Sequence, residues 1–147
     1  MNGNRNRKTT AAFTLVEILI VVIILGILAA IVIPKFSSAS DEARESALKR
    51  DLQTVRAQLE LYRMQHDNVY PAAATFVTQL TTKTDRTGAA GTEFGPYMQE
   101  FPTNNFNDKT TVEVKAGTDG LGDGSHGWFF DTTAGRFYAD TSDQMTW

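Results

Sequence analysis

An uninterrupted apolar run over residues 13–33 constrains this chain more than any other feature of its sequence. From Ile18 to the end of the run there is no polar side chain. As a helix, which rises about 1.5 Å per residue, the run would cover about 30 Å, the thickness of the hydrocarbon core of a bilayer. A helix that is apolar on every face is poorly explained as part of the core of a soluble protein of 147 residues. The run therefore predicts a membrane-spanning helix.

Glu17 is the one acidic residue of this run and lies just over one helical turn inside it. An ionised carboxylate in lipid costs about 3 kcal/mol on insertion scales, so such a residue is by default a functional candidate that needs a partner. The same position is compatible with a carboxylate at the headgroup boundary that reaches water. Position alone leaves both interpretations open.

The residues before the apolar run indicate which way the helix crosses the membrane. Residues 1–12 carry Arg5, Arg7 and Lys8 and no acidic side chain, and a basic flank of this kind stays in the cytoplasm. A secretory signal peptide would have a shorter apolar region followed by a small-residue cleavage site. Here the alanine pair at residues 29–30 leads straight into further apolar residues, so we do not expect the whole run to be removed.

The start of the run resembles the amino terminus of type IV pilins and of the pseudopilins of type II secretion systems. The resemblance rests on Phe-Thr-Leu-Val-Glu at residues 13–17, the aliphatic residues that follow, Gly26 and Pro34. It implies that a prepilin peptidase removes residues 1–12 on the cytoplasmic side and that the new amino-terminal Phe13 is N-methylated. The helix then remains as a membrane anchor and later forms part of a filament core.

The bond between Ala12 and Phe13 is the implied processing site. Ala12 departs from the family pattern, which has glycine immediately before the cut, although a small residue still suits a tight protease pocket. Cleavage would create an α-amino group at Phe13, close to the depth of Glu17, and an ammonium and a carboxylate relieve each other's desolvation in lipid. That amino group belongs to the same helix or to a neighbouring subunit. The family implies the neighbour, which gives Glu17 a role in the register of assembly.

Gly26 and Pro34 mark the part of the apolar segment that bends or unwinds most easily. Proline lacks a backbone donor and clashes with the carbonyl group of Ala30 in a continuous helix, and glycine has a low helix propensity. The family resemblance implies that the helix loosens between these two residues when subunits pack in a filament. A simple kink at the membrane exit is the other interpretation.

After this segment, which we delimit as residues 13–34, the pattern becomes amphipathic over residues 35–66. Apolar residues recur at steps of three and four, which predicts a helix with one stripe to bury. The stripe consists of Phe36, Ala39, Ala43, Ala47, Leu48, Leu52, Val55, Leu59 and Tyr62. Together with the membrane segment it forms a helix of more than fifty residues.

Residues 67–147 predict a loop region and a carboxy-terminal antiparallel sheet. Three segments have the alternation or composition of strands, with a four-residue turn ending at Gly135 between the last two: residues 111–115, 128–131 and 136–140. Such a meander has one face to cover, and the apolar stripe is the obvious cover. The expected fold class is α+β and pilin-like, with a long amino-terminal helix packed on this small sheet.

The segment between the long helix and the strands carries weaker signals. A short helical piece is expected over residues 74–80 and an exposed loop over residues 81–95. Gly-Pro-Tyr-Met at residues 95–98, followed by residues 102–107, resembles a loop of the major pseudopilins. Asn105 departs from that pattern, because the family usually has a second proline there.

A glycine-rich stretch over residues 117–124 resembles the calcium-holding loop of major pseudopilins in its Gly-x-Asp-Gly start. Calcium takes six or more oxygen ligands, and Asp119, Asp123 and backbone carbonyl groups can supply several of them. The later acidic ligand of the family has no clear counterpart here. A glycine-rich turn with two solvated aspartates is the commoner outcome of such a pattern, so we assign no metal ligand and no cofactor.

Charge and composition disfavour several other functions. The chain has 14 basic and 17 acidic side chains, and loss of residues 1–12 would leave 11 basic ones against the same 17. Nucleic-acid binding needs a basic surface, and no such surface is evident in the sequence. There is no cysteine, hence no disulfide framework and no thiolate site. His66 and His126 have no neighbouring nucleophile or paired acid in sequence, so we assign no catalytic residue and do not expect an enzyme.

The resemblance implies a structural subunit of a type II secretion pseudopilus. It implies as partners other copies of the chain, the prepilin peptidase, the inner-membrane assembly platform, minor pseudopilins and the membrane, but no nucleic acid. The expected location is the bacterial inner membrane, as a single-pass protein with its amino terminus in the cytoplasm and its carboxy-terminal domain in the periplasm, and then the assembled filament. The alternatives are a type IV pilus subunit for adhesion, motility or DNA uptake, and a monomeric membrane-anchored binding domain. Glu17 and Phe13 favour the filament, since a simple anchor has no reason to keep an acid in lipid.

Overall fold

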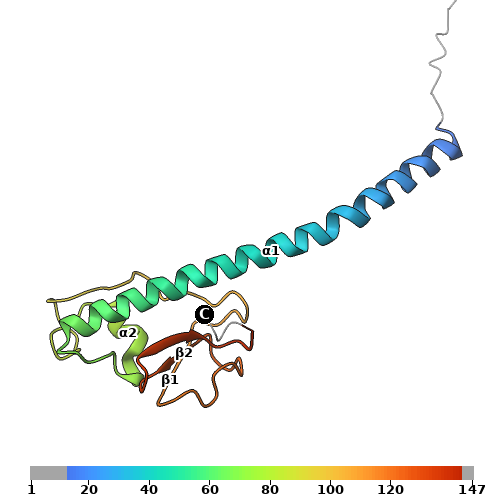
Figure 1. Cartoon of the computed structure of the whole chain (residues 1–147). Coiled ribbons are helices and arrows are strands. Elements are labelled where there is room, and N and C mark those ends of the chain that lie inside the picture. Colours follow the sequence, from blue (N-terminus) through green and yellow to red (C-terminus); the bar gives the residue numbers. More distant parts are fainter. Residues whose placement is uncertain (1–12, 144–147) are drawn as a thin grey trace, which may run out of the picture. The chain divides into compact units, whose positions relative to one another are not determined.

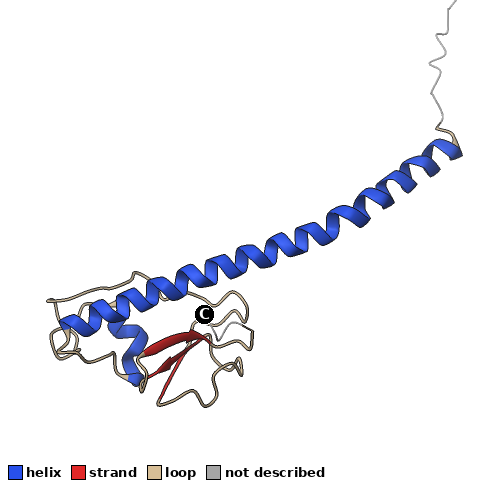
Figure 2. Cartoon of the chain, in the orientation of Figure 1, coloured by secondary structure: helices blue, strands red, loops and turns tan. Residues whose placement is uncertain are grey.

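The chain forms two compact units, Met1–Asp41 and Glu42–Trp147. A computed structural model describes residues 13–143, without the side chains of residues 34–38. Its elements follow one another as α1 (Leu15–Gln65), the 3-10 helix η1 (Ala73–Thr75), α2 (Phe76–Thr81), β1 (Val112–Lys115), β2 (Trp128–Asp131) and β3 (Arg136–Ala139). Figure 1 labels α1, α2, β1 and β2, and Figure 2 colours the helices blue and the strands red. This is the α+β, pilin-like fold expected from the sequence.

Helix α1 has 51 residues and runs without a break through both units. It ends at Gln65, where Asp67 and Asn68 take the left-handed conformation with φ of 51° and 66°. The N–H group of Asn68 donates to the carbonyl oxygen of Arg63 at 2.9 Å, five residues back, as in a Schellman-type helix end. The helix therefore ends one residue before the expected boundary at residue 66, and the two residues that take the left-handed conformation are aspartate and asparagine, which adopt it more readily than most residues.

The apolar stripe of α1 is buried only from Leu48 onward. Five of its large side chains are between 0% and 2% exposed: Leu48, Leu52, Val55, Leu59 and Tyr62. Ala39 and Ala43 are exposed instead, and the side chain of Phe36 lies outside the described part. The predicted stripe is thus too long at its amino-terminal end, because a spacing pattern does not reveal where its cover begins.

The sheet has the order β1-β2-β3, and its first pairing differs from the prediction. β2 and β3 pair antiparallel, with Phe130 opposite Phe137, as expected. β1 and β2 pair parallel, with Val112 opposite Trp128, so the expectation of a wholly antiparallel sheet is wrong. The physical reason is the connection over residues 116–127, which is long enough to return the chain to the end where β1 started, whereas an antiparallel hairpin needs only a short turn.

The core of the second unit is largely aromatic. All four residues of β2 are buried, as expected of a central strand. The ring of Trp128 stacks on Phe137 with centroids 5.4 Å apart, and Phe76 of α2 lies 5.2 Å from Phe130. The Trp128 indole N–H donates to the carbonyl oxygen of Pro102 at 2.9 Å, which satisfies the one polar group of that side chain.

The segment after α1 is more ordered than its composition predicted. The expected helical piece is present as η1 and α2. The exposed loop expected over residues 81–95 is wrong at Thr84, which is 1% exposed and exchanges two backbone hydrogen bonds of 3.0 Å with Phe94. The Thr84 hydroxyl group also lies 3.0 Å from Nε2 of His66, so a partner from α1 explains the burial of this polar residue.

Replacement of a buried stripe residue tests this core. Leu52→Ala should destabilise the second unit by about 2–5 kcal/mol, because it removes apolar burial and leaves a cavity. Leu52 is 1% exposed, whereas Leu61 on the same helix is 38% exposed, so Leu61→Ala is a matched control. The measurement is denaturant unfolding of the full chain in detergent, followed by tryptophan fluorescence. Equal losses in the two variants would contradict the assigned face.

Candidate functional site

The apolar half of α1 has no cover among the residues that the structure describes. Its membrane-length stretch, Leu15–Ile33, has 19 residues, a mean hydropathy of 3.3 and no buried residue. Every large apolar side chain in it is between 43% and 82% exposed. By length and composition this stretch can cross a bilayer, and in water it would expose far more contiguous apolar surface than a soluble monomer does. It therefore requires lipid, other helices, or both.

Thr14 caps this helix, a role that the sequence interpretation missed. Its hydroxyl oxygen accepts a hydrogen bond from the N–H group of Glu17 at 3.2 Å. This is one half of a capping box, the Thr-x-x-Glu arrangement in which the two residues satisfy each other's backbone donors. The sequence signal of this cap, Thr14-Leu15-Val16-Glu17, was present at the start of the apolar run. Glu17 thus lies in the first turn of α1, where the helix dipole favours a negative charge.

The residues of the expected assembly site lie together at this end of α1. Phe13 precedes the cap and is 74% exposed, and Glu17 is exposed as well. Ala12, the other half of the expected processing site, lies outside the described residues. The pairing of the Glu17 carboxylate with an amino group stays a prediction.

Gly26 and Pro34 both lie inside the continuous helix. A Cβ atom added to Gly26 would have no other atom within 4 Å, so no contact inside the chain requires glycine there. The remaining physical consequences of glycine are a low helix propensity and room for a neighbouring helix. Local loosening between these residues in a filament stays a prediction.

His66 is a structural residue of the second unit. It is 3% exposed, its Nδ1 atom lies 2.8 Å from the carbonyl oxygen of Tyr62, and its Nε2 atom lies 3.0 Å from the hydroxyl oxygen of Thr84. Its ring stacks on that of Tyr62 with centroids 3.7 Å apart. Both ring nitrogens thus have partners within the fold, and the residue joins the end of α1 to the segment after α2.

His126 lies beside a serine and a glutamate, but not in the geometry of a catalytic triad. The hydroxyl oxygen of Ser125 is 2.9 Å from Nδ1 of His126, and Oε2 of Glu113 is 3.8 Å from the same nitrogen. A triad needs the nucleophile on one ring nitrogen and the acid on the other, so that the ring can pass a proton between them. This cluster therefore does not activate Ser125.

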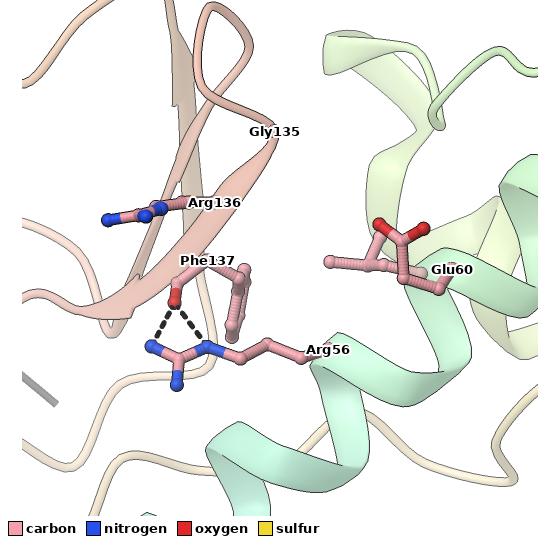
Figure 3. Close-up of a pocket in the computed structure, with 6 residues that line it drawn as sticks. Arg56, Glu60, Gly135, Arg136 and Phe137 are labelled. Carbon is pink, nitrogen blue, oxygen red and sulfur yellow. Dashed lines mark hydrogen bonds between the residues drawn. The ribbon is translucent and has the colours of Figure 1, made fainter.

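A cavity of about 210 Å³ lies between α1 and β3 (Figure 3). It is lined by Arg56, Leu59, Glu60, Gly135, Arg136 and Phe137. The Arg56 guanidinium group donates twice to the carbonyl oxygen of Phe137, from Nε at 2.9 Å and from Nη2 at 2.7 Å. Burial lowers the pKa of Arg56, an effect that the neighbouring Tyr138 opposes and Arg136 reinforces. The arrangement fastens α1 to the edge of the sheet.

The glycine-rich stretch does not form the calcium site that its sequence resembles. Among the residues from 13 to 143, no three or more His, Cys, Asp or Glu side chains converge on a point where a metal ion could be held. The carbonyl oxygen of Asp119 accepts a hydrogen bond from the Lys115 ammonium group at 3.0 Å. Oδ1 of Asp123 accepts one from the N–H group of Ser125 at 2.7 Å. The donor set therefore does not fit the ion.

Asp131 fixes the beginning of this stretch to the turn between β2 and β3. Its Oδ1 atom accepts hydrogen bonds of 2.8 Å from the N–H groups of Gly117 and Thr133. Burial would raise the pKa of Asp131, but the N–H groups of Thr133, Gly117 and Ala134 outweigh burial, and the pKa lies below its ordinary value. Because the folded state holds the ionised form, this contribution to stability is present above the ordinary pKa of about 4.

The stability of the chain should accordingly fall in acid partly through Asp131. As the pH drops from about 4 to about 2, protonation of this carboxylate removes its stabilisation, so the midpoint of unfolding should decrease. Asp131→Asn should lower stability at neutral pH and flatten this pH dependence, as measured by thermal melts across the range. Glu100→Gln, at an exposed carboxylate, is the control and should leave the profile unchanged. An unchanged slope in Asp131→Asn would contradict this assignment.

Two protein-family models match this chain. The model of the prokaryotic N-terminal methylation motif matches residues 7–33, and that of type II secretion system protein G matches residues 35–122. The chain is 40% identical over 78 residues to the type II secretion system core protein G of Pseudomonas aeruginosa, and this alignment covers 52% of the chain and 54% of that protein. It is 30% identical over 124 residues to the protein of the same name from Vibrio cholerae, which covers 78% of the chain and 84% of that protein. No solved structure matches.

An apolar amino-terminal helix of membrane length that continues into a small α+β domain defines the class of pilin-like filament subunits. Within this class, the chain belongs to the type II secretion system protein G family, as the match over residues 35–122 shows. The resemblance inferred from residues 13–17, Gly26 and Pro34 is thereby confirmed. The chain spans about half the length of the Pseudomonas relative that it matches.

Proposed function

We propose that this chain is a structural subunit of a type II secretion pseudopilus. The observation that carries the proposal is the membrane-length stretch Leu15–Ile33, which none of residues 13–143 covers and which begins with a capped turn containing Glu17. A helix of this kind finds cover first in lipid and then among identical helices in a filament. The secretion system is favoured over a surface pilus because the relatives described above all carry the name core protein G.

The processing that this function needs concerns residues 12 and 13. A prepilin peptidase cleaves between Ala12 and Phe13 on the cytoplasmic side, and Phe13 is then N-methylated. The match of the methylation motif over residues 7–33 supports this step. The cleaved chain stays in the inner membrane as a single-pass protein, with its amino terminus in the cytoplasm and the second unit in the periplasm.

Assembly rests on Glu17. Its carboxylate and the amino group of Phe13 in the next subunit form an ion pair when the two apolar helices meet, and each removes the other's cost of standing alone in lipid. The pair forms only when two helices have the correct axial offset. It therefore sets the register of the filament.

The partners of this function are copies of the same chain, the prepilin peptidase, the inner-membrane assembly platform and the minor pseudopilins. Nucleic acid is not among them, because acidic side chains outnumber basic ones by 17 to 14 and the excess grows when the basic leader is removed. The function is structural, with no catalytic step.

Mass spectrometry of the membrane-extracted protein tests the processing step. The chain should begin at Phe13, with the mass of one methyl group added at its amino terminus. A strain that lacks the prepilin peptidase is the control, and it should yield the uncleaved chain that begins at Met1. An intact Met1 start in the complete strain, or loss of everything before Pro34, would contradict the proposed function.

Replacement of Glu17 tests the assembly step. Glu17→Leu should give a stable, cleaved and membrane-inserted subunit that does not enter filaments. The helix cap survives, because Thr14 binds the backbone N–H group of residue 17 rather than its side chain. The loss falls on the neighbour's ammonium group, and breaking a buried pair from one side costs about 3–5 kcal/mol, or a factor of hundreds in association.

The measurement for Glu17→Leu is the yield of sheared or crosslinked filaments beside an immunoblot of subunit in the membrane. Glu42→Leu is the matched control, since Glu42 is an exposed acid on the same helix beyond the apolar stretch, and it should assemble normally. Wild-type filament yield from Glu17→Leu would mean that this carboxylate merely reaches water, and would refute its assembly role.

A further inference from the structure

The connection between the parallel strands β1 and β2 is unusual in its construction. A parallel crossover of about a dozen residues normally contains a helix, which satisfies its own backbone groups. Residues 116–127 contain no helix. Four of their glycines have positive φ, from 71° to 94°, so the path turns repeatedly: Gly117, Gly120, Gly122 and Gly124. We call residues 116–127 the crossover loop. Its backbone groups must find partners outside regular structure.

Two lysine ammonium groups donate hydrogen bonds to three carbonyl groups of the crossover loop. Nζ of Lys109 donates to the carbonyl oxygens of Gly124 at 2.7 Å and of Ser125 at 3.0 Å. Nζ of Lys115 donates to the carbonyl oxygen of Asp119 at 3.0 Å. The two lysines therefore hold opposite halves of the crossover loop.

Gly127 lets Lys109 approach the loop this closely. A Cβ atom at residue 127 would collide with the carbonyl oxygen of Lys109, so no other residue type fits there without a backbone shift. The N–H groups of Gly127 and Trp128 both donate to the carbonyl oxygen of Thr111 at 3.0 Å, which aligns the end of the loop with the start of β1. The backbone of Lys109 therefore lies against residue 127, and its ammonium group reaches the carbonyl groups of Gly124 and Ser125 from there.

One buried carboxylate accepts hydrogen bonds from two N–H groups of the crossover loop. Asp140 is 0% exposed, and its two oxygens accept hydrogen bonds from Gly122 at 2.6 Å and His126 at 2.9 Å. Its own N–H group donates to the carbonyl oxygen of Gly127 at 3.1 Å. Both carboxylate oxygens are thus engaged with backbone donors, which are the partners that a buried carboxylate needs.

Two further acids at the loop, Asp123 and Glu113, also have donors close by. The pKa of Asp123 lies below its ordinary value, chiefly because the hydroxyl and N–H groups of Ser125 donate to its carboxylate, with Asp140 and His126 adding to the effect. Oε2 of Glu113 faces His126 at 3.8 Å. The carboxylates of Asp123 and Glu113 therefore each face a donor within the fold.

We propose that the ammonium groups of Lys109 and Lys115 and the carboxylate of Asp140 close the crossover loop without a calcium ion, in contrast to the loop that its sequence resembles. Calcium would need loop oxygens at 2.3–2.6 Å, and three of the loop's carbonyl oxygens already accept hydrogen bonds from cations. Those same cations repel a divalent ion. The match to the protein G family ends at residue 122, inside the crossover loop, so the second half of the loop lies outside the family pattern.

The test compares calcium with lysine substitution on the full chain in detergent. The wild-type chain should have the same melting temperature, and the same hydrogen-exchange rates over residues 116–127, with CaCl₂ at about 1 mM as with a chelator. Lys109→Met should lower the melting temperature by about 4 °C or more and speed exchange in the loop, because two carbonyl groups lose a charged donor. Lys115→Met should act in the same direction and more weakly, since it removes one contact.

Lys83→Met is the matched control, because Lys83 is exposed and lies outside the crossover loop, and it should leave both readouts unchanged. Magnesium at the same concentration controls for ionic strength. A calcium-specific rise in the wild-type melting temperature, or calcium-specific protection of residues 116–127, would overturn the proposal. The proposal would also be overturned if the hydrogen-exchange rates over residues 116–127 in Lys109→Met and in Lys115→Met both equalled the rates in Lys83→Met.

Discussion

The constraint on which the rest of this structure depends is that the described residues leave one half of α1 without cover. No residue of the stretch Leu15–Ile33 is buried, whereas five large apolar residues on one face of the same helix, Leu48, Leu52, Val55, Leu59 and Tyr62, are buried under a sheet and loops. Apolar surface of that extent has a lower free energy in lipid or against similar helices than in water. The described part of the chain therefore buries its apolar side chains only in the second unit, and the apolar stretch needs lipid or other apolar helices to cover it.

In the proposed function, the second unit must keep its fold while the surroundings of the apolar helix change from lipid to protein. The second unit meets this requirement with contacts of its own. The aromatic core around Trp128, the double hydrogen bond from Arg56 to Phe137, and the contacts of His66 all lie within residues 42–147. None of them involves a residue of the membrane stretch, so exchange of lipid for neighbouring helices leaves them unchanged.

Local sequence patterns predicted the features that depend on local physics. The membrane-length helix, the end of the amphipathic helix near residue 66, and the segments of β2 and β3 follow from hydropathy, spacing and alternation. Strand direction was predicted wrongly, because alternation in β1 is the same for either pairing. The burial of Thr84 depends on His66, which is 18 residues away, and three loop carbonyl groups are engaged by Lys109 and Lys115, which no local pattern connects with this loop. Thr14 alone was missed although its local signal was present.

The cap at Thr14 also bears on how an acid can reside at the membrane boundary before assembly. The first turn of a helix has N–H groups without intrahelical partners and the positive end of the helix dipole, and both stabilise a carboxylate. Thr14 binds the N–H group of Glu17 itself, which leaves other first-turn donors and the dipole to act on the Glu17 side chain. An amino group created at Phe13 would stand at this same positive end, where a cation is disfavoured. Its need for a carboxylate would therefore arise from the helix as well as from the lipid, and in the proposed assembly the Glu17 carboxylate of a neighbouring subunit would meet both needs.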